Sequence, residues 1–390
     1  MSRRYYDGMD FRRTLNIDEL RRVAMRRLPE FAFEYIEGGA EDERALHWNR
    51  AVFDRLRFMP RTLVNTEGRH CRTRLFGMER ALPLIIAPTG INGMLWRNGD
   101  IELARAAALA SIPFCLSTMS NARIERVAAE AGCRLWMQLY VFNDKRLSED
   151  IVARAERAEC EALMFTTDAN VFGSREWDRR SYRRAGVLTM RKSVNAAMRM
   201  RWWTNVLFPK GMPRFENVAD FFPLAARSAK AGVTLVPKLF HPTIDWDDVA
   251  RLRDQWRRRL ILKGVLSIED AQRAVSLGCD AIVLSNHGGR QLDSCVSPMD
   301  VLKEIASNVG DRIAIVIDSG FRRGSDVVKA LALGADAVML GRAVLYGLAA
   351  GGEPGVSHAL GLLRGEIDRT LGQLGCRAVA DLHPNMLRAD

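Results

Sequence analysis

The sequence predicts an α/β fold, a (β/α)8 TIM barrel with an N-terminal helical segment and a long insertion after the fourth strand. Short apolar runs recur from residue 81 onward, and glycine or polar residues bound each one. Such runs are typical of strands buried on both faces of a parallel sheet. Amphipathic stretches of helical length separate most of them, and eight such units close a barrel. A doubly wound sheet is the alternative, but it usually has fewer strands and a nucleotide-binding loop after the first.

The predicted strands and helices alternate at a nearly constant spacing. Most strand ends lie about 22 to 33 residues apart, the length of one strand plus one helix. The strands are expected at residues 82–88, 113–118, 134–140, 162–168, 260–264, 281–288, 313–320 and 337–343. The clearest helical patterns lie at residues 100–110, 124–131, 267–277 and 324–333.

Residues 1–80 precede the first barrel strand and are expected to be mainly helical. Asn16 can cap a helix, with Glu19 three residues later and an apolar run beyond it. A second helical stretch over residues 31–37 ends at two glycines. We expect this segment to pack on a barrel of residues 81–378, with residues 379–390 as a C-terminal tail.

The regular alternation of strands and helices is interrupted once, by an insertion that we assign to residues 169–259. It is far longer than one helix requires, and such insertions at the C-terminal face of a barrel are usually lids or binding loops. Between residues 175 and 214 there are eleven basic residues and two acidic ones. This segment therefore carries most of the net charge of +11.

The composition excludes several classes of protein. Apolar residues are 48% and charged residues 27%, the balance of a soluble globular chain. The seven cysteines form no CxxC pair, which favours a reducing compartment and therefore the cytoplasm. The sequence contains no Rossmann, P-loop, zincin or hydrolase-elbow motif, and we expect no metal site.

Polar side chains follow nearly every predicted strand, and barrel active sites lie at those ends. Polar residues at a point where a strand merely leaves the core are the alternative. The strand-end residues are Thr89, Gly90, Ser117, Gln138, Tyr140, Thr166, Asp168, Lys263, Ser285, His287, Asp318, Gly341 and Arg342.

His287 is the strongest candidate for a general base, because two glycines and Arg290 follow it. A structural loop histidine is the alternative. Asp168 could orient the imidazole and stabilise its cationic form. Lys263 ends an apolar strand, where a lysine needs an anion or a functional site, unless its chain extends to solvent.

Glycines and arginines follow the last two strands. Gly320 and Arg322 come after the seventh strand, and Gly341 and Arg342 come after the eighth. This pattern matches the usual phosphate site of barrel enzymes. Exposed arginines in turns are the alternative.

Several motifs resemble those of the FMN-dependent α-hydroxy-acid dehydrogenase/oxidase family. They are SNHGGRQLD (285–293), EYIEGGAEDE (34–43), QLY (138–140), TTD (166–168) and LKG (262–264). PTGINGMLW (88–96) and DSGFRRGSD (318–326) are most similar to the membrane-associated (S)-mandelate and L-lactate dehydrogenases. The resemblance runs from about Asn16 to about Gly375 and implies FMN as cofactor.

The resemblance also implies roles for individual residues. His287 would take the substrate α-proton, or the hydroxyl proton if hydride moves directly, with Asp168 paired to its imidazolium. Tyr140 and Lys263 would complete the catalytic group. Substrate binding would fall to Tyr35, Arg175, Arg290, Met119 and Phe172. FMN would contact Pro88, Thr89, Gly90, Ser117, Gln138, Thr166, Lys263, Ser285, Asp318, Gly320, Arg322, Gly341 and Arg342.

The expected activity is oxidation of a small (S)-2-hydroxy acid, mandelate-like or lactate-like, to the 2-oxo acid. Gly90 stands where the family's oxidases usually carry alanine, so the resemblance favours a quinone or another non-oxygen electron acceptor. An oxidase that produces hydrogen peroxide is the alternative. A non-redox phosphate-binding barrel and a basic nucleic-acid-binding protein are more distant alternatives, and we expect no nucleic acid partner.

Residues 186–213 mix basic residues with Trp202, Trp203, Leu207 and Phe208. This mixture suits the surface of an anionic bilayer. The resemblance implies peripheral membrane contact through this segment, at the inner face of the cell membrane. A mobile lid with a solvated basic face is the alternative. The resemblance also implies a homo-oligomer, with a homotetramer expected.

Overall fold

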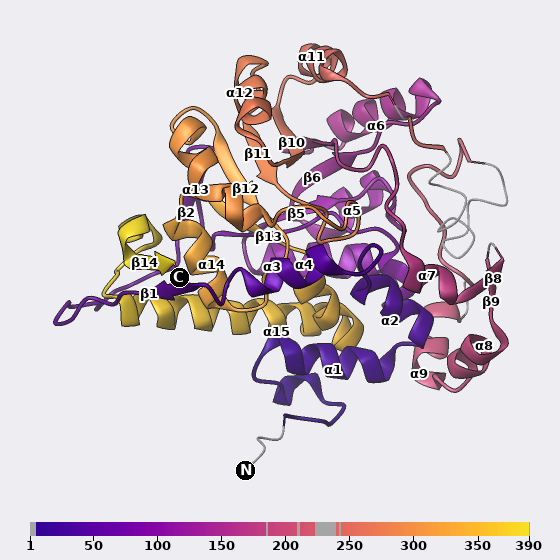
Figure 1. Ribbon diagram of the computed structural model, residues 1–390. Coiled ribbons are helices and arrows are strands. Elements are labelled where there is room, and N and C mark those ends of the chain that lie inside the picture. The colour runs from indigo at the N-terminus through magenta and orange to yellow at the C-terminus, as the bar shows by residue number, and fades with distance from the viewer. Residues whose placement is uncertain (1–4, 185, 209–210, 223–238, 242, 390) are drawn as a thin grey trace.

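A closed barrel of eight parallel strands forms the centre of the molecule (Figure 1). The computed structural model describes residues 5–184, 186–208, 211–222, 239–241 and 243–389. The strand order around the barrel is β10-β11-β12-β13-β4-β5-β6-β7. Along the chain, these strands are β4 (Leu84–Ile86), β5 (Pro113–Leu116), β6 (Arg134–Leu139), β7 (Ala162–Thr166), β10 (Arg259–Val265), β11 (Ala281–Leu284), β12 (Ala314–Ile317) and β13 (Ala337–Leu340). Each coincides with one predicted run, so the predicted barrel is confirmed.

Two hydrophobic clusters explain why the strands are apolar on both faces. Ile85, Trp136 and Met164 belong to an inner cluster that fills the barrel. Their neighbours Leu84 and Leu163 belong to the larger cluster between the strands and the helices. Because the interior is packed, a binding site must lie at the ends of the strands.

Helices surround the barrel. They are α4 (Gly99–Leu109), α5 (Ile124–Ala131), α6 (Lys145–Arg157), α11 (Trp246–Gln255), α12 (Ile268–Ser276), α13 (Pro298–Val309), α14 (Gly324–Ala332) and α15 (Arg342–Leu374). The four helices predicted most clearly agree with these bounds within one residue. The long α15 is interrupted at Gly351 and Gly352, where the backbone leaves the helical conformation.

The N-terminal segment lies across the barrel and ends beside the C-terminus. It contains η1 (Phe11–Arg13), α1 (Ile17–Arg27), α2 (Glu30–Glu37), α3 (Arg44–Ala51) and β1 (Leu56–Phe58). The Asn16 side chain accepts from the Glu19 amide at 2.9 Å, so the predicted N-cap is confirmed. The Glu19 carboxylate instead accepts from the amides of Tyr6 and Leu15, and no capping box forms.

Short strands cover the N-terminal end of the barrel strands and pair the two ends of the chain. The hairpin of β2 (Thr73–Leu75) and β3 (Met78–Arg80) packs Leu75 against the inner cluster. The tail contains η6 (Val379–Asp381), η7 (Pro384–Met386) and β14 (Leu387–Ala389). Strand β14 pairs antiparallel with β1.

The insertion after β7 forms small elements beside α2 (Figure 1). They are α7 (Glu176–Arg180), β8 (Tyr182–Arg184), β9 (Val187–Leu188), α8 (Met190–Ala197), α9 (Met200–Trp202) and the π-helical η3 (Trp203–Leu207). Helix α11, which we had counted within the insertion, is the helix that precedes β10. Residues 185, 209–210, 223–238 and 242 of the predicted insertion lie outside the described residues.

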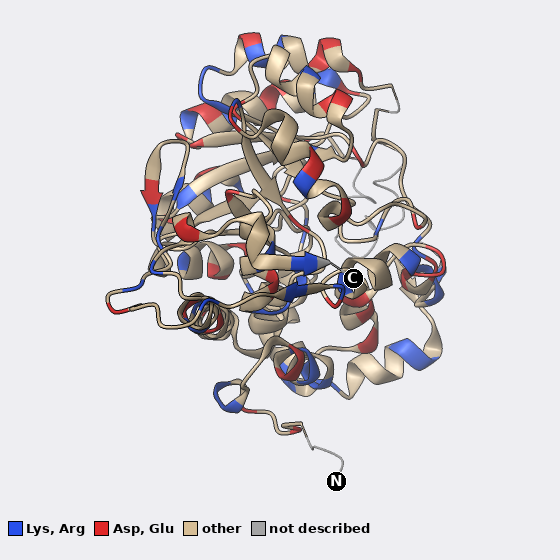
Figure 2. Cartoon of the chain, turned by 60° about the vertical axis from the view of Figure 1, so that its left-hand side comes forward, with Lys and Arg blue, Asp and Glu red and all other residues tan. Residues whose placement is uncertain are grey.

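Two findings bear on the surface of the molecule. Basic and acidic residues are interspersed over the helices around the barrel (Figure 2). No helix in the described part of the chain combines the length and apolar character that crossing a bilayer requires.

Candidate active site

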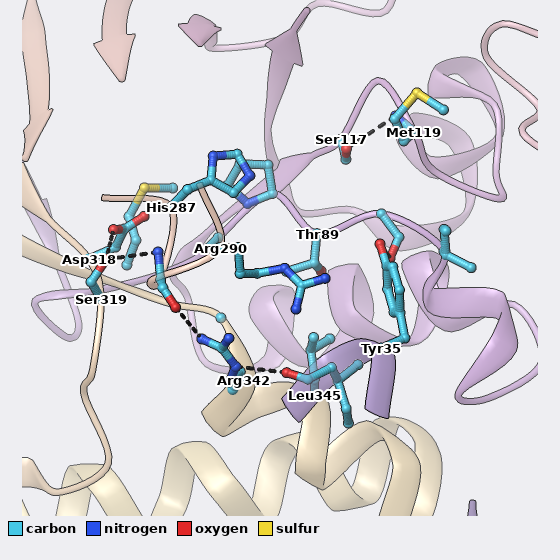
Figure 3. A pocket seen from close by; sticks show the side chains of 18 of the residues that line it. Tyr35, Thr89, Ser117, Met119, His287, Arg290, Asp318, Ser319, Arg342 and Leu345 are labelled. Atoms are coloured by element: carbon cyan, nitrogen blue, oxygen red, sulfur yellow. Dashed lines mark hydrogen bonds between the residues drawn. The ribbon is translucent and has the colours of Figure 1, made fainter. Parts of the chain in front are cut away.

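A cavity lies at the C-terminal ends of the barrel strands (Figure 3). Helix α2 contributes Tyr35 to its lining, and the insertion contributes Phe172 and Arg175. Including its open mouth, the cavity encloses about 1230 Å³. Most of the predicted site residues line it. They are Tyr35, Pro88, Thr89, Gly90, Ser117, Met119, Tyr140, Phe172, Arg175, Lys263, His287, Arg290, Asp318, Gly320, Arg322, Gly341 and Arg342.

Four predicted residues, namely Gln138, Thr166, Asp168 and Ser285, stand behind this lining. Ser117 donates to Gln138 Oε1 at 3.2 Å, and Gln138 Nε2 donates to Thr166 Oγ1 at 3.0 Å. Ser285 Oγ accepts from Lys263 Nζ, and Asp168 Oδ1 lies 2.9 Å from His287 Nδ1. These four side chains therefore act on the cavity by holding the residues that face it.

His287 occupies a tight turn after β11. Its φ is +56°, and Gly288 and Gly289 continue the left-handed conformation with φ of +66° and +74°. Its Nδ1 lies 2.9 Å from Asp168 Oδ1. The carboxylate therefore holds the proton on Nδ1 and leaves Nε2, 3.4 Å from the Tyr140 hydroxyl, with its lone pair. Burial lowers the pKa of His287 although Asp168 opposes this effect, so the ring is neutral at neutral pH.

The neighbouring Asn286 fixes this turn through the N-terminal segment. Asn49 on α3 and Asn286 exchange two amide hydrogen bonds of 2.8 Å, and both side chains are buried. Asn286 Oδ1 also accepts from the Gly289 amide at 3.1 Å. Asn49 was not predicted as a site residue, since nothing local in the sequence indicates a contact with a residue 237 positions away.

Lys263 is a buried cation with three polar neighbours. Its Nζ donates to Ser285 Oγ at 2.7 Å and lies 3.4 Å from Asp318 and 3.9 Å from Asp168. Burial lowers the pKa of Lys263, but the two carboxylates outweigh burial and raise the pKa above its usual value. The ammonium group is therefore charged at the edge of the cavity.

Two arginines, Arg175 and Arg290, meet at the mouth of the cavity. The Arg175 guanidinium lies over the Phe172 ring at 4.4 Å, and its Nε donates to the Arg290 carbonyl at 3.3 Å. Burial and the charge of Arg290 lower the pKa of Arg175 to about 10. Arg290 donates to the Gly38 carbonyl at 2.6 Å and lies 5.2 Å from the centre of the Tyr35 ring.

The ends of β12 and β13 form another part of the cavity wall. Gly320 has a φ of +92°, and a Cβ there would overlap the Asn49 carbonyl, so this turn requires glycine. A Cβ at Gly341 would meet nothing within 4 Å, which leaves open space at the start of α15. Arg342 donates to the carbonyls of Ile36, Gly38 and Gly288, and Arg322 donates to the Tyr346 hydroxyl at 3.4 Å. Open backbone beside two arginines suits a phosphate group.

An aromatic wall that the sequence analysis missed lines one side of the cavity. The Phe240 ring stacks on Phe172 at 5.6 Å and on Phe142 at 5.0 Å, and it meets Tyr140 edge-on at 4.9 Å. The His241 amide donates to the Val141 carbonyl at 3.0 Å, which fixes the end of the insertion to the end of β6. A phenylalanine near the end of a long insertion gives no periodic signal, so this contact could not be predicted.

Comparison with known proteins places the chain among flavin enzymes. A family profile described as FMN-dependent dehydrogenase matches residues 24–389. (S)-Mandelate dehydrogenase of Pseudomonas putida is 43% identical over 374 residues, which cover 96% of this chain and 93% of the relative. L-Lactate dehydrogenase of Caulobacter sp. (strain K31) is 40% identical, with 95% and 97% covered.

Solved structures agree with this placement. The crystal structure of the monotopic membrane protein (S)-mandelate dehydrogenase matches with a TM-score of 0.91 and 42% identity, covering 97% of this chain and 100% of that one. A mandelate oxidase with (S)-4-hydroxymandelic acid matches with a TM-score of 0.80 and 35% identity, covering 96% and 99%. These similar proteins include both a dehydrogenase and an oxidase.

Proposed function

The chain belongs to the FMN-dependent dehydrogenase family, and on that premise we propose that it oxidises an (S)-2-hydroxy acid to the 2-oxo acid. The pairing of His287 with Asp168 at 2.9 Å, opposite Arg175 and Arg290, is the observation that carries this proposal. A 2-hydroxy acid has one carboxylate to bind and one C–H bond to oxidise. The cavity offers two arginines for the first and a neutral imidazole for the second.

FMN is the cofactor, and the residues of the cavity fit it. When bound, FMN supplies the acceptor for the two electrons that leave the substrate. Lys263 is a charged, buried donor, and Ser117 with Gln138 and Thr166 forms a connected set of hydroxyl and amide groups. The open turns at the ends of β12 and β13 offer room for the phosphate, beside Arg322 and Arg342. The remaining proposed contacts come from the lining residues Pro88, Thr89, Gly90, Asp318, Gly320 and Gly341. Ser285 stands behind this lining and holds Lys263 through its hydroxyl.

His287 acts as the base through Nε2. Asp168 holds the proton on Nδ1 and stabilises the imidazolium that forms when Nε2 takes a second proton. That second proton comes from the α-carbon, or from the hydroxyl if hydride leaves directly. Burial together with the Asp168 charge raises the pKa of Tyr140 well above its usual value, so its hydroxyl stays protonated and can donate to the substrate oxygen.

Arg175 and Arg290 bind the substrate carboxylate, and Tyr35 on α2 closes over it. The planar guanidinium groups suit a carboxylate because each can donate two parallel hydrogen bonds. Met119 and Phe172 border the space for the substrate side chain. Turnover of mandelate, lactate and glycolate, followed by bleaching of the visible flavin spectrum, tests the proposal. Bleaching by none of the three would refute 2-hydroxy-acid oxidation.

A quinone or another non-oxygen compound is the proposed electron acceptor. Gly90 supports this proposal, because the family's oxidases usually carry alanine at this position. A Cβ there would lie 3.1 Å from Met119 and 3.6 Å from the Tyr35 hydroxyl. An oxidase that produces hydrogen peroxide is the second candidate, and one solved structure of similar fold is an oxidase. Anaerobic reduction by substrate, followed by mixing with oxygen, separates the two. Rapid reoxidation by oxygen would favour the oxidase.

We also propose peripheral membrane contact through residues 186–213, in a homotetramer at the inner face of the cell membrane. Apolar side chains are exposed along the described part of this segment, as Met198, Met200 and Phe208 illustrate with exposed fractions of 69%, 75% and 66%. Exposed apolar residues among arginines suit an anionic bilayer surface. Deletion of residues 186–213 followed by cell fractionation is the test. A full-length chain that is soluble without detergent would contradict the membrane proposal.

A further inference from the structure

Asp178 is a buried carboxylate that stands directly behind one of the proposed substrate arginines. It lies on α7, and its side chain is 5% exposed. Its Oδ2 lies 3.5 Å from Nη2 of Arg290. Arg290 lines the cavity and Asp178 does not, so the arginine separates this carboxylate from the space where substrate would bind.

Within the described residues, neither oxygen of Asp178 has a hydrogen-bond partner, and neither does Nη2 of Arg290. The ion pair with Arg290 is therefore the main compensation for burying this carboxylate. Burial raises the pKa of Asp178, while the charges of Arg290, Arg175 and Arg342 oppose that rise. The carboxylate thus sits amid three cations and is tied most directly to one of them.

Arg290 needs such a counter-charge because its neighbour repels it. The Arg175 guanidinium lies in the same pocket wall, and the charge of Arg290 lowers the pKa of Arg175. On the other side, the Gly38 carbonyl at the end of α2 accepts from Nη1 of Arg290 at 2.6 Å. Asp178 and Gly38 together hold two corners of the guanidinium, which leaves its remaining N–H donors for the cavity.

We propose that Asp178 is a positioning residue for substrate binding, which holds Arg290 so that its free donors meet the substrate carboxylate. This inference rests on the proposed function, because it assumes that Arg290 binds that carboxylate. It assigns a role to α7, which the insertion supplies and which lies outside the barrel strands. It also predicts an effect that depends on the charge of the substrate.

The test compares an acid with its uncharged ester. Asp178→Asn keeps the shape of the side chain and removes its charge. For the 2-hydroxy acid that the substrate panel selects, we expect KM to rise about tenfold while kcat stays within about threefold. For the methyl ester of that acid, which has no carboxylate, we expect kcat/KM to change less than about twofold. The dissociation constant of the 2-oxo acid product, measured from the flavin spectrum, should rise with KM.

Glu34→Gln is the matched control. Glu34 is half-buried on α2, and burial and the nearby charge of Asp178 raise its pKa. Within the described residues Glu34 makes no ion pair with Arg290. Glu34→Gln removes one negative charge close to Asp178, as Asp178→Asn does, and should leave the acid-to-ester preference unchanged. Asp178→Ser serves as a second variant if the asparagine variant does not accumulate with bound flavin.

Arg290→Met separates this inference from the proposed function. If the Arg290 variant keeps the wild-type preference for the acid over the ester, then the carboxylate site itself is wrong. If that variant loses the preference but Asp178→Asn retains it, then only the role of Asp178 is wrong. Equal loss of acid and ester turnover in Asp178→Asn would indicate a purely structural role and would also overturn the proposal.

Discussion

The rim of the barrel and residues 190–208 of the insertion after β7 differ in which side chains they expose to solvent. At the rim, Lys263 is 4% exposed, yet two carboxylates and a hydroxyl surround its ammonium group. In the insertion, Met190 and Trp203 are 81% and 51% exposed, and the Arg191 side chain is 83% exposed. Charges are buried with partners in one region, while apolar groups are left in solvent in the other.

This difference indicates that the two regions depend on different partners, one inside the chain and one outside it. A buried charge is tolerated where other groups of the same chain compensate it, so chemistry at the rim depends on internal geometry. Exposed apolar groups are compensated only by a surface outside the chain. Changes at the rim should therefore reduce catalysis in any medium. Changes of the exposed apolar residues within 190–208 should alter association and leave catalysis intact.

Replacement of the base at the rim should give the largest effect. We expect His287→Asn to lower kcat by about 10³–10⁴-fold, because the amide can fill the turn but cannot take a proton. Rapid-mixing measurement of flavin reduction by substrate checks this expectation. His383→Asn, at an exposed position in the tail, is the control. Retention of more than about a tenth of the wild-type rate would remove His287 from the role of base.

Loss of the partner of the base should give the next largest effect, with a defined change in pH dependence. The neutral ring is the active form, so kcat/KM should fall as the pH decreases through the pKa of His287, which burial places below 6.5. Asp168 raises that pKa. We therefore expect Asp168→Asn to lower kcat/KM by about 10²-fold or more at neutral pH and to move the acidic limb to lower pH.

The pH–rate profiles of the two proteins are the measurement. Asp42→Asn, at an exposed loop position, should leave the profile in place. A limb that moves toward higher pH in Asp168→Asn would mean that the ion pair does not set the protonation of His287.

The residues of the rim were largely predictable from sequence, and the contacts that the insertion makes with the rest of the chain were not. Strand ends can be located from the period of apolar residues, and parallel strands bring their carboxyl ends to one rim. Lys263 and His287 could therefore be identified as polar residues at the end of an apolar run. The chemistry of Asp178 was not visible, because its partner Arg290 lies on another element, and no local pattern joins α7 to the turn after β11.

The same reason explains the other contacts that sequence analysis missed. Asn49 meets Asn286, and Arg290 meets the carbonyl of Gly38, across 237 and 252 positions of the chain. Periodicity specifies which face of an element is buried and not which side chain from a distant segment it meets. The N-terminal segment was thus predicted as helices, while its part in holding the catalytic turn became apparent from the fold.

A change of the exposed apolar side chains within residues 190–208 should affect membrane association alone. Replacement of Met198, Met200, Trp203 and Phe208 by serine removes exposed apolar area, and we expect binding to anionic vesicles to weaken about tenfold or more. Flotation with vesicles of phosphatidylglycerol and phosphatidylcholine measures this. Turnover with a soluble electron acceptor should stay within about twofold, because none of the four side chains lines the cavity.

The control for that experiment removes exposed apolar groups elsewhere. Leu15 and Leu109 are 76% and 72% exposed on other parts of the molecule. Leu15→Ser combined with Leu109→Ser should leave vesicle binding unchanged. Equal loss in both proteins would indicate general surface hydrophobicity instead of a membrane-binding segment.

The smallest expected effect lies where the two regions touch. Glu30 on α2 accepts from Lys192 Nζ at 2.8 Å and from Asn195 Nδ2 at 3.1 Å, which docks α8 onto the helix that carries Tyr35. The Lys192 hydrogen bond lowers the pKa of Glu30 against the effect of burial. We expect Glu30→Gln to lower the free energy of unfolding by about 1 kcal/mol or less, as for other partly exposed ion pairs.

Hydrogen exchange of residues 190–197 is the more sensitive measurement and should accelerate a few-fold in Glu30→Gln. Lys145→Gln, at an exposed helix start on the barrel, is the control. If the rim and the insertion are independent, KM for the 2-hydroxy acid should not change. A rise in KM that accompanies faster exchange would show that α8 helps to hold Tyr35 over the substrate. The insertion and the rim would then be coupled through α2.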